Sequence, residues 1–293
     1  MFKYCHTLLF VLALCLAVPV KAQVVLFESE SVHYQAPKVP DSIVFAGETW
    51  SFDRPDMYER MDRELIAFTY SHTISTLMLK RAGRIFSQIV PLLKENGIPE
   101  DLKYLMAIES NLDPKAISSA GAGGLWQFMK GTGRDYGLEV NAEVDERFHL
   151  VKATEAACQY LKNAYEKYGD WMTVAASYNA GQNGISRRIE EQKQSHAMDL
   201  LLPEETSRYM FRILAAKYFF EHPEKFGYVI DPDSQYRHKA PQKTVEVSGP
   251  VPNLADFAKE HGTSYYLLRE ANPWLRSDHL TNKAGKTYLI TIP

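Results

Sequence analysis

Residues 100–129 read EDLKYLMAIESNLDPKAISSAGAGGLWQFM, an apolar stretch that runs into a glycine-rich segment. In its first part Leu102, Leu105 and Met106 recur at the spacing of one helix face, and Glu109 follows Leu102 by seven residues. Seven residues are nearly two helical turns, so the spacing predicts a short helix with Glu109 on the side that faces the core. A carboxyl group held against apolar surface has a raised pKa, as a general acid needs near neutral pH. A glutamate that bends outward at the helix end, or pairs with a base, is the alternative.

Outward from this stretch, helical patterns extend from about Asp56 to about Glu221 and predict a mainly α fold. The segment 110–137 interrupts them with six glycines. A glycine-rich loop inside a helical domain is typical of a binding or catalytic site. These glycines are Gly121, Gly123, Gly124, Gly131, Gly133 and Gly137.

The character of the sequence changes after Phe226. A polar segment, 229–243, contains Pro232 and Pro241 and is expected to be a linker. Residues 244–293 then show a strand, two short helices and a closing strand, a small α+β module.

The first 22 residues are typical of an export signal. Lys3 precedes the apolar run 8–18, and the small residues Val20 and Ala22 favour cleavage before Gln23. The run is too short for a comfortable membrane span. We therefore expect an exported, periplasmic or cell-envelope-associated protein, with a buried first helix as the alternative.

The chain has three cysteines and a net charge of −3. A lipid anchor at Cys15 is an open alternative, although Leu14 stands where a lipidation site needs a small residue. Cleavage would leave Cys158 alone, which excludes a disulfide within the chain and a cysteine-based zinc site. The slightly negative charge argues against nucleic acid as a partner.

Three motifs, taken in order, resemble those of the lytic murein transglycosylases of the goose-lysozyme superfamily. The first is the run from Glu109 to Met129 with its Gly-Leu-Trp-Gln, the second is Tyr-Asn-Ala-Gly at 178–181, and the third is Glu205-Thr206-x-x-Tyr209. The similarity spans roughly residues 85–219. Within the family, the chain most resembles the membrane-bound murein transglycosylase D group. The similarity implies a lysozyme-like helical catalytic domain whose chemistry calls for no metal or organic cofactor.

The resemblance also implies roles for individual residues. Glu109 would protonate the oxygen between N-acetylmuramic acid and N-acetylglucosamine in peptidoglycan, and would then take a proton from the 6-hydroxyl that closes a 1,6-anhydro ring. Other positions would bind the sugars, hold the catalytic carboxyl or line the cleft, although Ser118 could instead be a turn residue and Met129 a core residue. The implied substrate-binding residues are Ser118, Gln127, Met129, Thr132, Tyr178, Asn179 and Glu205.

One departure from the family pattern affects the mechanism. Asp113 precedes Pro114 where many relatives have asparagine, and most glycosidases use two carboxyl groups. A hydrolytic muramidase with Asp113 as second carboxylate is therefore an alternative, although the position before proline favours a turn. A peptidoglycan-binding protein without activity is another alternative.

Residues 244–293 resemble a LysM module. The similarity rests on the segment 254–262, on Asn272-Pro273, and on a final strand that ends at Pro293. It implies binding to N-acetylglucosamine-containing glycan, which would tether the enzyme to its polymer; a purely structural cap is the alternative.

Loose association with the outer membrane or cell wall is a further expectation. The expected layout is a signal peptide at 1–22, a lead-in at 23–55, the catalytic domain at 56–228, the linker at 229–243 and the LysM-like module at 244–293.

Overall fold

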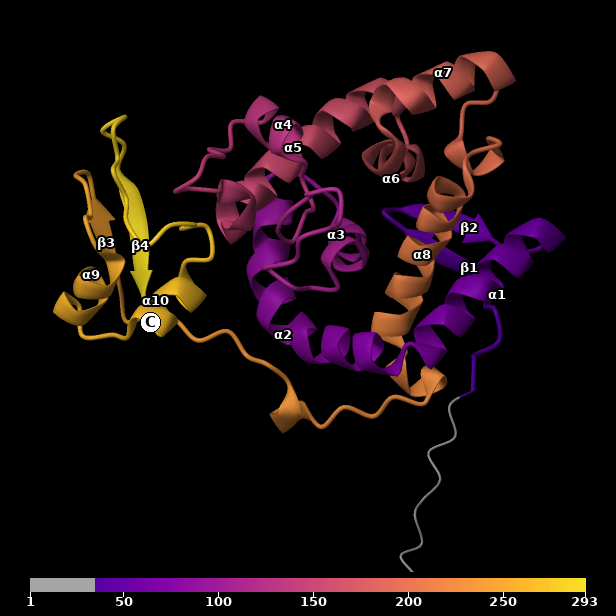
Figure 1. Ribbon diagram of the computed structural model, residues 1–293. Helices are drawn as coiled ribbons and strands as arrows, with labels where there is room; N and C mark the ends of the chain where they lie inside the picture. The colour runs from indigo at the N-terminus through magenta and orange to yellow at the C-terminus, as the bar shows by residue number, and fades with distance from the viewer. Residues whose placement is uncertain (1–34) are drawn as a thin grey trace, which may run out of the picture. The chain divides into compact units, whose positions relative to one another are not determined.

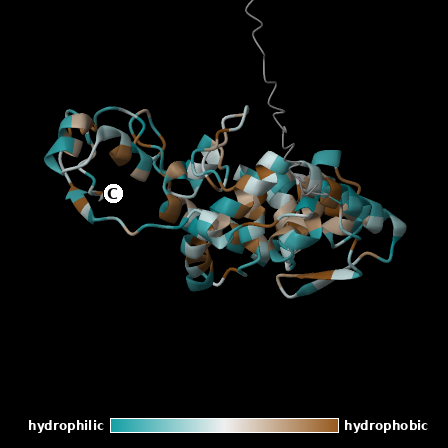
Figure 2. Cartoon of the chain, turned by 90° about the horizontal axis from the view of Figure 1, so that it is seen from below, coloured by the Kyte–Doolittle hydropathy of each residue, from teal (hydrophilic) through white to brown (hydrophobic). Residues whose placement is uncertain are grey.

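The computed structural model describes residues 35–293 and is mainly helical (Figure 1). The expected signal peptide and the cysteine considered for lipidation lie outside the described residues. Within the described part, no helix combines the length and the hydropathy needed to span a membrane. Hydrophobic and hydrophilic residues alternate along the helices, as amphipathic packing requires (Figure 2).

Two long helices, α1 (Pro55–Tyr70) and α2 (His72–Glu95), precede the short helix α3 (Leu102–Ser110). Residues 99–101, directly before this helix, form a tighter turn. Their carbonyl groups accept i+3 hydrogen bonds, as in Leu102 N–H to Pro99 C=O at 3.1 Å. Helix α4 (Lys130–Asp135) follows the glycine-rich loop.

The second half of the domain contains four more helices. They are α5 (Leu150–Tyr168), α6 (Trp171–Ala180), α7 (Gln182–Gln192) and α8 (Glu204–Glu221). Asp170 caps α6, because its carboxylate accepts the N–H of Thr173 at 2.7 Å. Helix α8 packs against α1, α3 and α6, so it connects the first helices of the domain with its second half (Figure 1).

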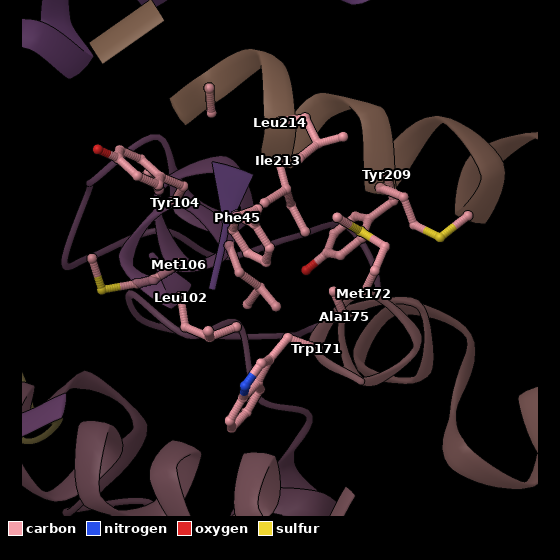
Figure 3. Packing of buried hydrophobic residues seen from close by; sticks show 14 of the residues in the cluster. Phe45, Leu102, Tyr104, Met106, Trp171, Met172, Ala175, Tyr209, Ile213 and Leu214 are labelled. Carbon is pink, nitrogen blue, oxygen red and sulfur yellow. The ribbon is translucent and has the colours of Figure 1, made fainter. Parts of the chain in front are cut away.

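A β-hairpin that the sequence patterns did not predict precedes the helices. Strand β1 (Ser42–Phe45) pairs antiparallel with β2 (Glu48–Ser51), and Ala46 and Gly47 form the turn with positive φ angles of 52° and 88°. Phe45 is fully buried and lies between side chains of α3 and α8, including Leu102 and Ile213 (Figure 3). The hairpin therefore belongs to the core of the domain.

The segment after α8 leads to the predicted strand–helix–helix–strand module. Strand β3 (Lys243–Val247) pairs antiparallel with β4 (Tyr288–Ile292), and α9 (Leu254–Glu260) and α10 (Tyr265–Ala271) lie between them in the chain. The buried amide of Asn272 donates to the Leu268 and Thr291 carbonyls and thus fixes α10 to β4.

One loop of the helical domain contributes to the core of this module. Val144 and Phe148 belong to the module's cluster of buried residues, together with Leu275. The N–H of Asp145 donates to the carbonyl of Trp274 at 2.8 Å. Segment 144–148 therefore has apolar and hydrogen-bonded contacts with the C-terminal module.

Cys158 lies on the buried face of α5, as expected of a small hydrophobic residue. Burial raises the pKa of its thiol to about 11.

Candidate active site

The predicted apolar face of α3 is confirmed. Leu102, Leu105 and Met106 are all fully buried, and Glu109 is half-buried in the last turn of the helix. The helix ends directly after this turn, because Asn111 adopts a left-handed conformation with φ of 51°. The local sequence thus places a carboxyl group at the rim of the core.

Helix α8 supplies the direct partner of this carboxyl group. The hydroxyl of Tyr209, itself buried, donates to Oε1 of Glu109 at 2.5 Å. Burial raises the pKa of Glu109 to about 7; the Tyr209 hydrogen bond and the charge of Arg212 oppose this shift, and the charge of Glu205 adds to it. The pKa of Tyr209 is raised well above its ordinary value, chiefly by burial and then by the charge of Glu109, so Tyr209 remains a donor.

Tyr209 is part of the third sequence motif, but sequence reasoning did not assign it a role in the site. The signal that could have found it is its place four residues after Glu205, on the same side of a helix.

Tyr178 on α6 lies within electrostatic range of Glu109. Burial first, and the charge of Glu109 second, raise the pKa of Tyr178 well above its ordinary value. Its hydroxyl donates to the backbone carbonyl of Trp126 at 2.6 Å. The described hydrogen bond of Tyr178 therefore holds the glycine-rich loop, while its ring packs beside Phe128 and Tyr160.

Gln127 and Ser118 both hold the glycine-rich loop in shape. Gln127 has a positive φ of 49°, and its amide nitrogen donates to the carbonyls of Gly124 at 2.7 Å and Ala116 at 3.2 Å. Its carboxamide oxygen accepts no hydrogen bond from residues 35–293. Ser118 forms a turn, since its hydroxyl oxygen accepts the N–H of Ala122 at 3.0 Å.

A buried arginine that sequence reasoning missed supports the same loop. The guanidinium of Arg147 donates to the carbonyls of Gly121 and Phe128, each at 2.8 Å, and pairs with Asp145 at 2.6 Å. Gly124 is required beside it, because a Cβ there would lie 1.9 Å from the Arg147 carbonyl oxygen and the φ of Gly124 is +76°. No local pattern in the sequence predicts that Arg147 donates hydrogen bonds to this earlier loop.

The remaining predicted residues differ in exposure and in their contacts. Met129 is 45% exposed at the start of α4, and Thr132 is half-buried in that helix. Asn179 accepts a hydrogen bond from the hydroxyl of Thr206 at 2.8 Å, which joins the second motif to the third. Glu205 is exposed in the first turn of α8, and its charge acts on Glu109.

Asp113 has the turn role that its position before proline predicted. Its Oδ1 accepts the N–H of Lys115 at 2.9 Å, and its Oδ2 lies 3.6 Å from a guanidinium nitrogen of Arg81. The site around Glu109 thus contains one carboxyl group with a pKa near neutrality, next to a glycine-rich loop. Such a group can give up a proton and take one back at the same pH.

The part of the chain that the structure describes has no group of three histidine, cysteine, aspartate or glutamate side chains that could hold a metal ion. The arrangement around Glu109 is suited to proton transfer by a single carboxyl group.

Comparison with known families gives two matches. Residues 89–200 match the transglycosylase SLT domain, and residues 243–293 match the soluble lytic transglycosylase C-terminal LysM-like domain. The first match contains Glu109, Gln127 and Tyr178 and confirms the lysozyme-like fold class. The second coincides with the strand–helix–helix–strand module.

Individual proteins are similar over longer stretches. The membrane-bound lytic murein transglycosylase D of Escherichia coli strain K12 is 27% identical over 264 residues, covering 85% of this chain and 56% of that protein. The protein of the same name from Escherichia coli O6:H1 gives the same values. The chain thus spans about half the length of these relatives. A solved structure of an inactive mutant of lytic transglycosylase Slt from Pseudomonas aeruginosa has a TM-score of 0.40 at 20% identity, covering 53% of this chain and 26% of that one.

The chain therefore carries a transglycosylase SLT domain followed by a LysM-like domain, and it is homologous to the membrane-bound lytic murein transglycosylase D proteins.

Proposed function

We propose that this chain is a lytic transglycosylase that cleaves the β-1,4 bond between N-acetylmuramic acid and N-acetylglucosamine in peptidoglycan. The observation that carries the proposal is the carboxyl group of Glu109, whose pKa of about 7 is set by burial inside an SLT domain. The name of the Escherichia coli relatives, lytic murein transglycosylase, supports the same substrate.

In the first step Glu109, protonated, gives its proton to the glycosidic oxygen. The bond from the anomeric carbon to that oxygen breaks, and the N-acetylglucosamine leaves with a 4-hydroxyl group. The 2-acetamido group of the muramic acid stabilises the positive charge that develops at the anomeric carbon.

In the second step Glu109, now a carboxylate, takes the proton of the 6-hydroxyl of the same muramic acid. The 6-oxygen bonds to the anomeric carbon and closes the 1,6-anhydro ring, so Glu109 ends protonated and no water is consumed. The internal hydroxyl has the advantage of proximity, because it is attached to the sugar that reacts.

The neighbouring residues are assigned supporting roles. Tyr209 keeps the Glu109 carboxyl in position through its hydrogen bond. We assign sugar binding to Ser118, Gln127, Met129, Thr132, Tyr178, Asn179 and Glu205, with the carboxamide oxygen of Gln127 as an acceptor for a substrate N–H or O–H group.

The hydrolytic alternative receives less support from the geometry. It needs a second carboxylate that activates water, and the side chain of Asp113 is committed to a turn and to Arg81. A mechanism with one carboxyl group is therefore preferred.

We further propose that the protein is exported and works in the cell envelope, in loose association with the outer membrane or wall. The LysM-like module would hold it on the glycan through N-acetylglucosamine and so raise the local concentration of substrate.

The test is mass spectrometry of fragments released from purified peptidoglycan by residues 23–293. Muropeptides that end in 1,6-anhydro-muramic acid, each one water lighter than the hydrolysis product, are expected. The Glu109→Gln variant, prepared in parallel, controls for contaminating enzymes and should release none. Reducing ends would identify a muramidase instead, and binding without release would identify a non-catalytic wall protein.

A further inference from the structure

A second concave site lies beside Glu109, mostly outside the region that matches the SLT domain. It is a pocket of about 310 Å³ between α1, α2, α3 and α8. Two of its lining residues, Ile108 and Asn111, flank Glu109 in the chain. A group in this pocket would therefore be close to the bond that Glu109 is proposed to protonate.

One wall of the pocket is positively charged and rigidly held. Glu64 of α1 is fully buried, and it accepts hydrogen bonds from Nε of Arg208 at 2.7 Å and Nε of Arg212 at 3.3 Å. Arg63 also contacts Glu64 and is paired in addition with Glu204. A buried carboxylate that only positions arginines costs free energy, so its presence is explained if the arginines serve a ligand.

The terminal nitrogens of the two pocket arginines are available. Arg208 and Arg212 use Nε for Glu64, and their Nη atoms donate to no group among residues 35–293. The two side chains are 32% and 40% exposed. Two guanidinium groups against one carboxylate leave a net positive charge at the mouth of the pocket, which suits a carboxylate ligand bound through paired N–H groups.

The rest of the lining is mostly apolar. Apart from Ser71, Ser75 and Asn111, it is formed by Ala67, Phe68, Ile74, Met78 and Ile108. A ligand that combines carboxylate groups with short alkyl side chains would contact both the arginines and the apolar part of the lining. A sugar would fit this apolar part less well, because its hydroxyl groups would lose hydrogen bonds to water against it.

We propose that this pocket binds the peptide stem of the muramic acid next to the scissile bond, with stem carboxylates at Arg208 and Arg212. The stem combines carboxylates with alanine methyl groups, and it is attached to the sugar that Glu109 acts on. The inference rests on the proposed function for the identity of the polymer. It makes Arg208 and Arg212 determinants of specificity for strands whose stems carry free carboxylates.

The test uses two muropeptide oligomers of equal size: one carries short stems with free carboxylates, and in the other the same carboxyl groups are amidated. Binding of each to the Glu109→Gln variant is measured by calorimetry, which needs no turnover. We expect about tenfold weaker binding of the amidated oligomer, the effect of one lost charged hydrogen-bonded contact.

Arg208→Gln in the same background should bind both oligomers equally, whereas Arg187→Gln, an exposed arginine of α7, should keep the tenfold difference. Arg208→Lys, which keeps the charge, serves if the glutamine variant does not fold, and it should retain part of the preference. Equal binding of the two oligomers by the Glu109→Gln protein overturns the inference. Failure of the parent enzyme to form anhydro products overturns the proposed function, and the binding ratio still decides whether the pocket recognises carboxylates.

Discussion

Helix α8 contacts two glutamates, and the surroundings of their carboxyl groups differ. On one side Tyr209 presents a neutral hydroxyl to Glu109, and burial raises the pKa of that carboxyl group to about 7. On the other side Arg208 and Arg212 contact Glu64, which is fully buried. The two sites differ in the partner that α8 supplies: a neutral hydroxyl for Glu109, and guanidinium groups that form ion pairs with Glu64.

The largest expected difference between the two sides is in catalysis. Glu109→Gln should lower the rate of anhydro-muropeptide release by at least about 10³-fold, or about 4 kcal/mol of activation free energy, because the proton donor is lost. Initial rates on purified peptidoglycan measure this. A loss of less than tenfold would mean that another residue is the acid.

The same variant should not lose stability. Because the pKa of Glu109 in the folded protein lies above the ordinary 4.5, its contribution to stability is present below pH 4.5 and is lost as the pH rises through about 7. Glutamine removes that cost, so at pH 9 the variant should be more stable by about 3 kcal/mol in urea unfolding, and equal to the parent at pH 4.

The next effect, in size, belongs to the other side. Glu64→Gln leaves three half-buried arginine side chains without their carboxylate, and it should lower the free energy of unfolding by about 3 kcal/mol at pH 7. Urea denaturation measures it, with Glu59→Gln, an exposed glutamate of the same helix, as control. If Glu64→Gln were as stable as the parent, the contrast between the two sides would fail.

The smallest effect concerns the hydrogen bond of Tyr209. Activity should fall as the pH rises above about 7, because Glu109 must be protonated for the first step. Since the Tyr209 hydroxyl lowers the pKa of Glu109, Tyr209→Phe should move this alkaline limb upward by up to about one pH unit. Tyr160→Phe, whose hydroxyl donates to the Ser177 carbonyl instead, should leave the limb in place. An unchanged limb in Tyr209→Phe would mean that the hydrogen bond does not tune the acid.

The sequence predicts contacts between residues that are close in the chain better than contacts between distant ones. Seven-residue spacing was enough to place Glu109 on the buried face of α3, because helix geometry is local. The partner Tyr209 is 100 residues away, and Arg208 contacts Glu64 across 144 residues. No periodicity encodes such contacts, so the pocket could not be foreseen.

The hairpin at 42–51 was missed for a related reason. Its strands are four residues each, and only Gly47 signals the turn. The burial of Phe45 depends on α3 and α8, which come later in the chain (Figure 3). Short strands that are completed by distant helices carry little signal of their own.

The solitary cysteine of α5 has a practical consequence for those who handle the protein. With a thiol pKa of about 11, roughly one molecule in a thousand carries the reactive thiolate at pH 8. A fluorophore attached through maleimide would therefore go to a newly introduced surface thiol in residues 23–293 and leave Cys158 untouched, so the native sequence is already a suitable background for single-site labelling.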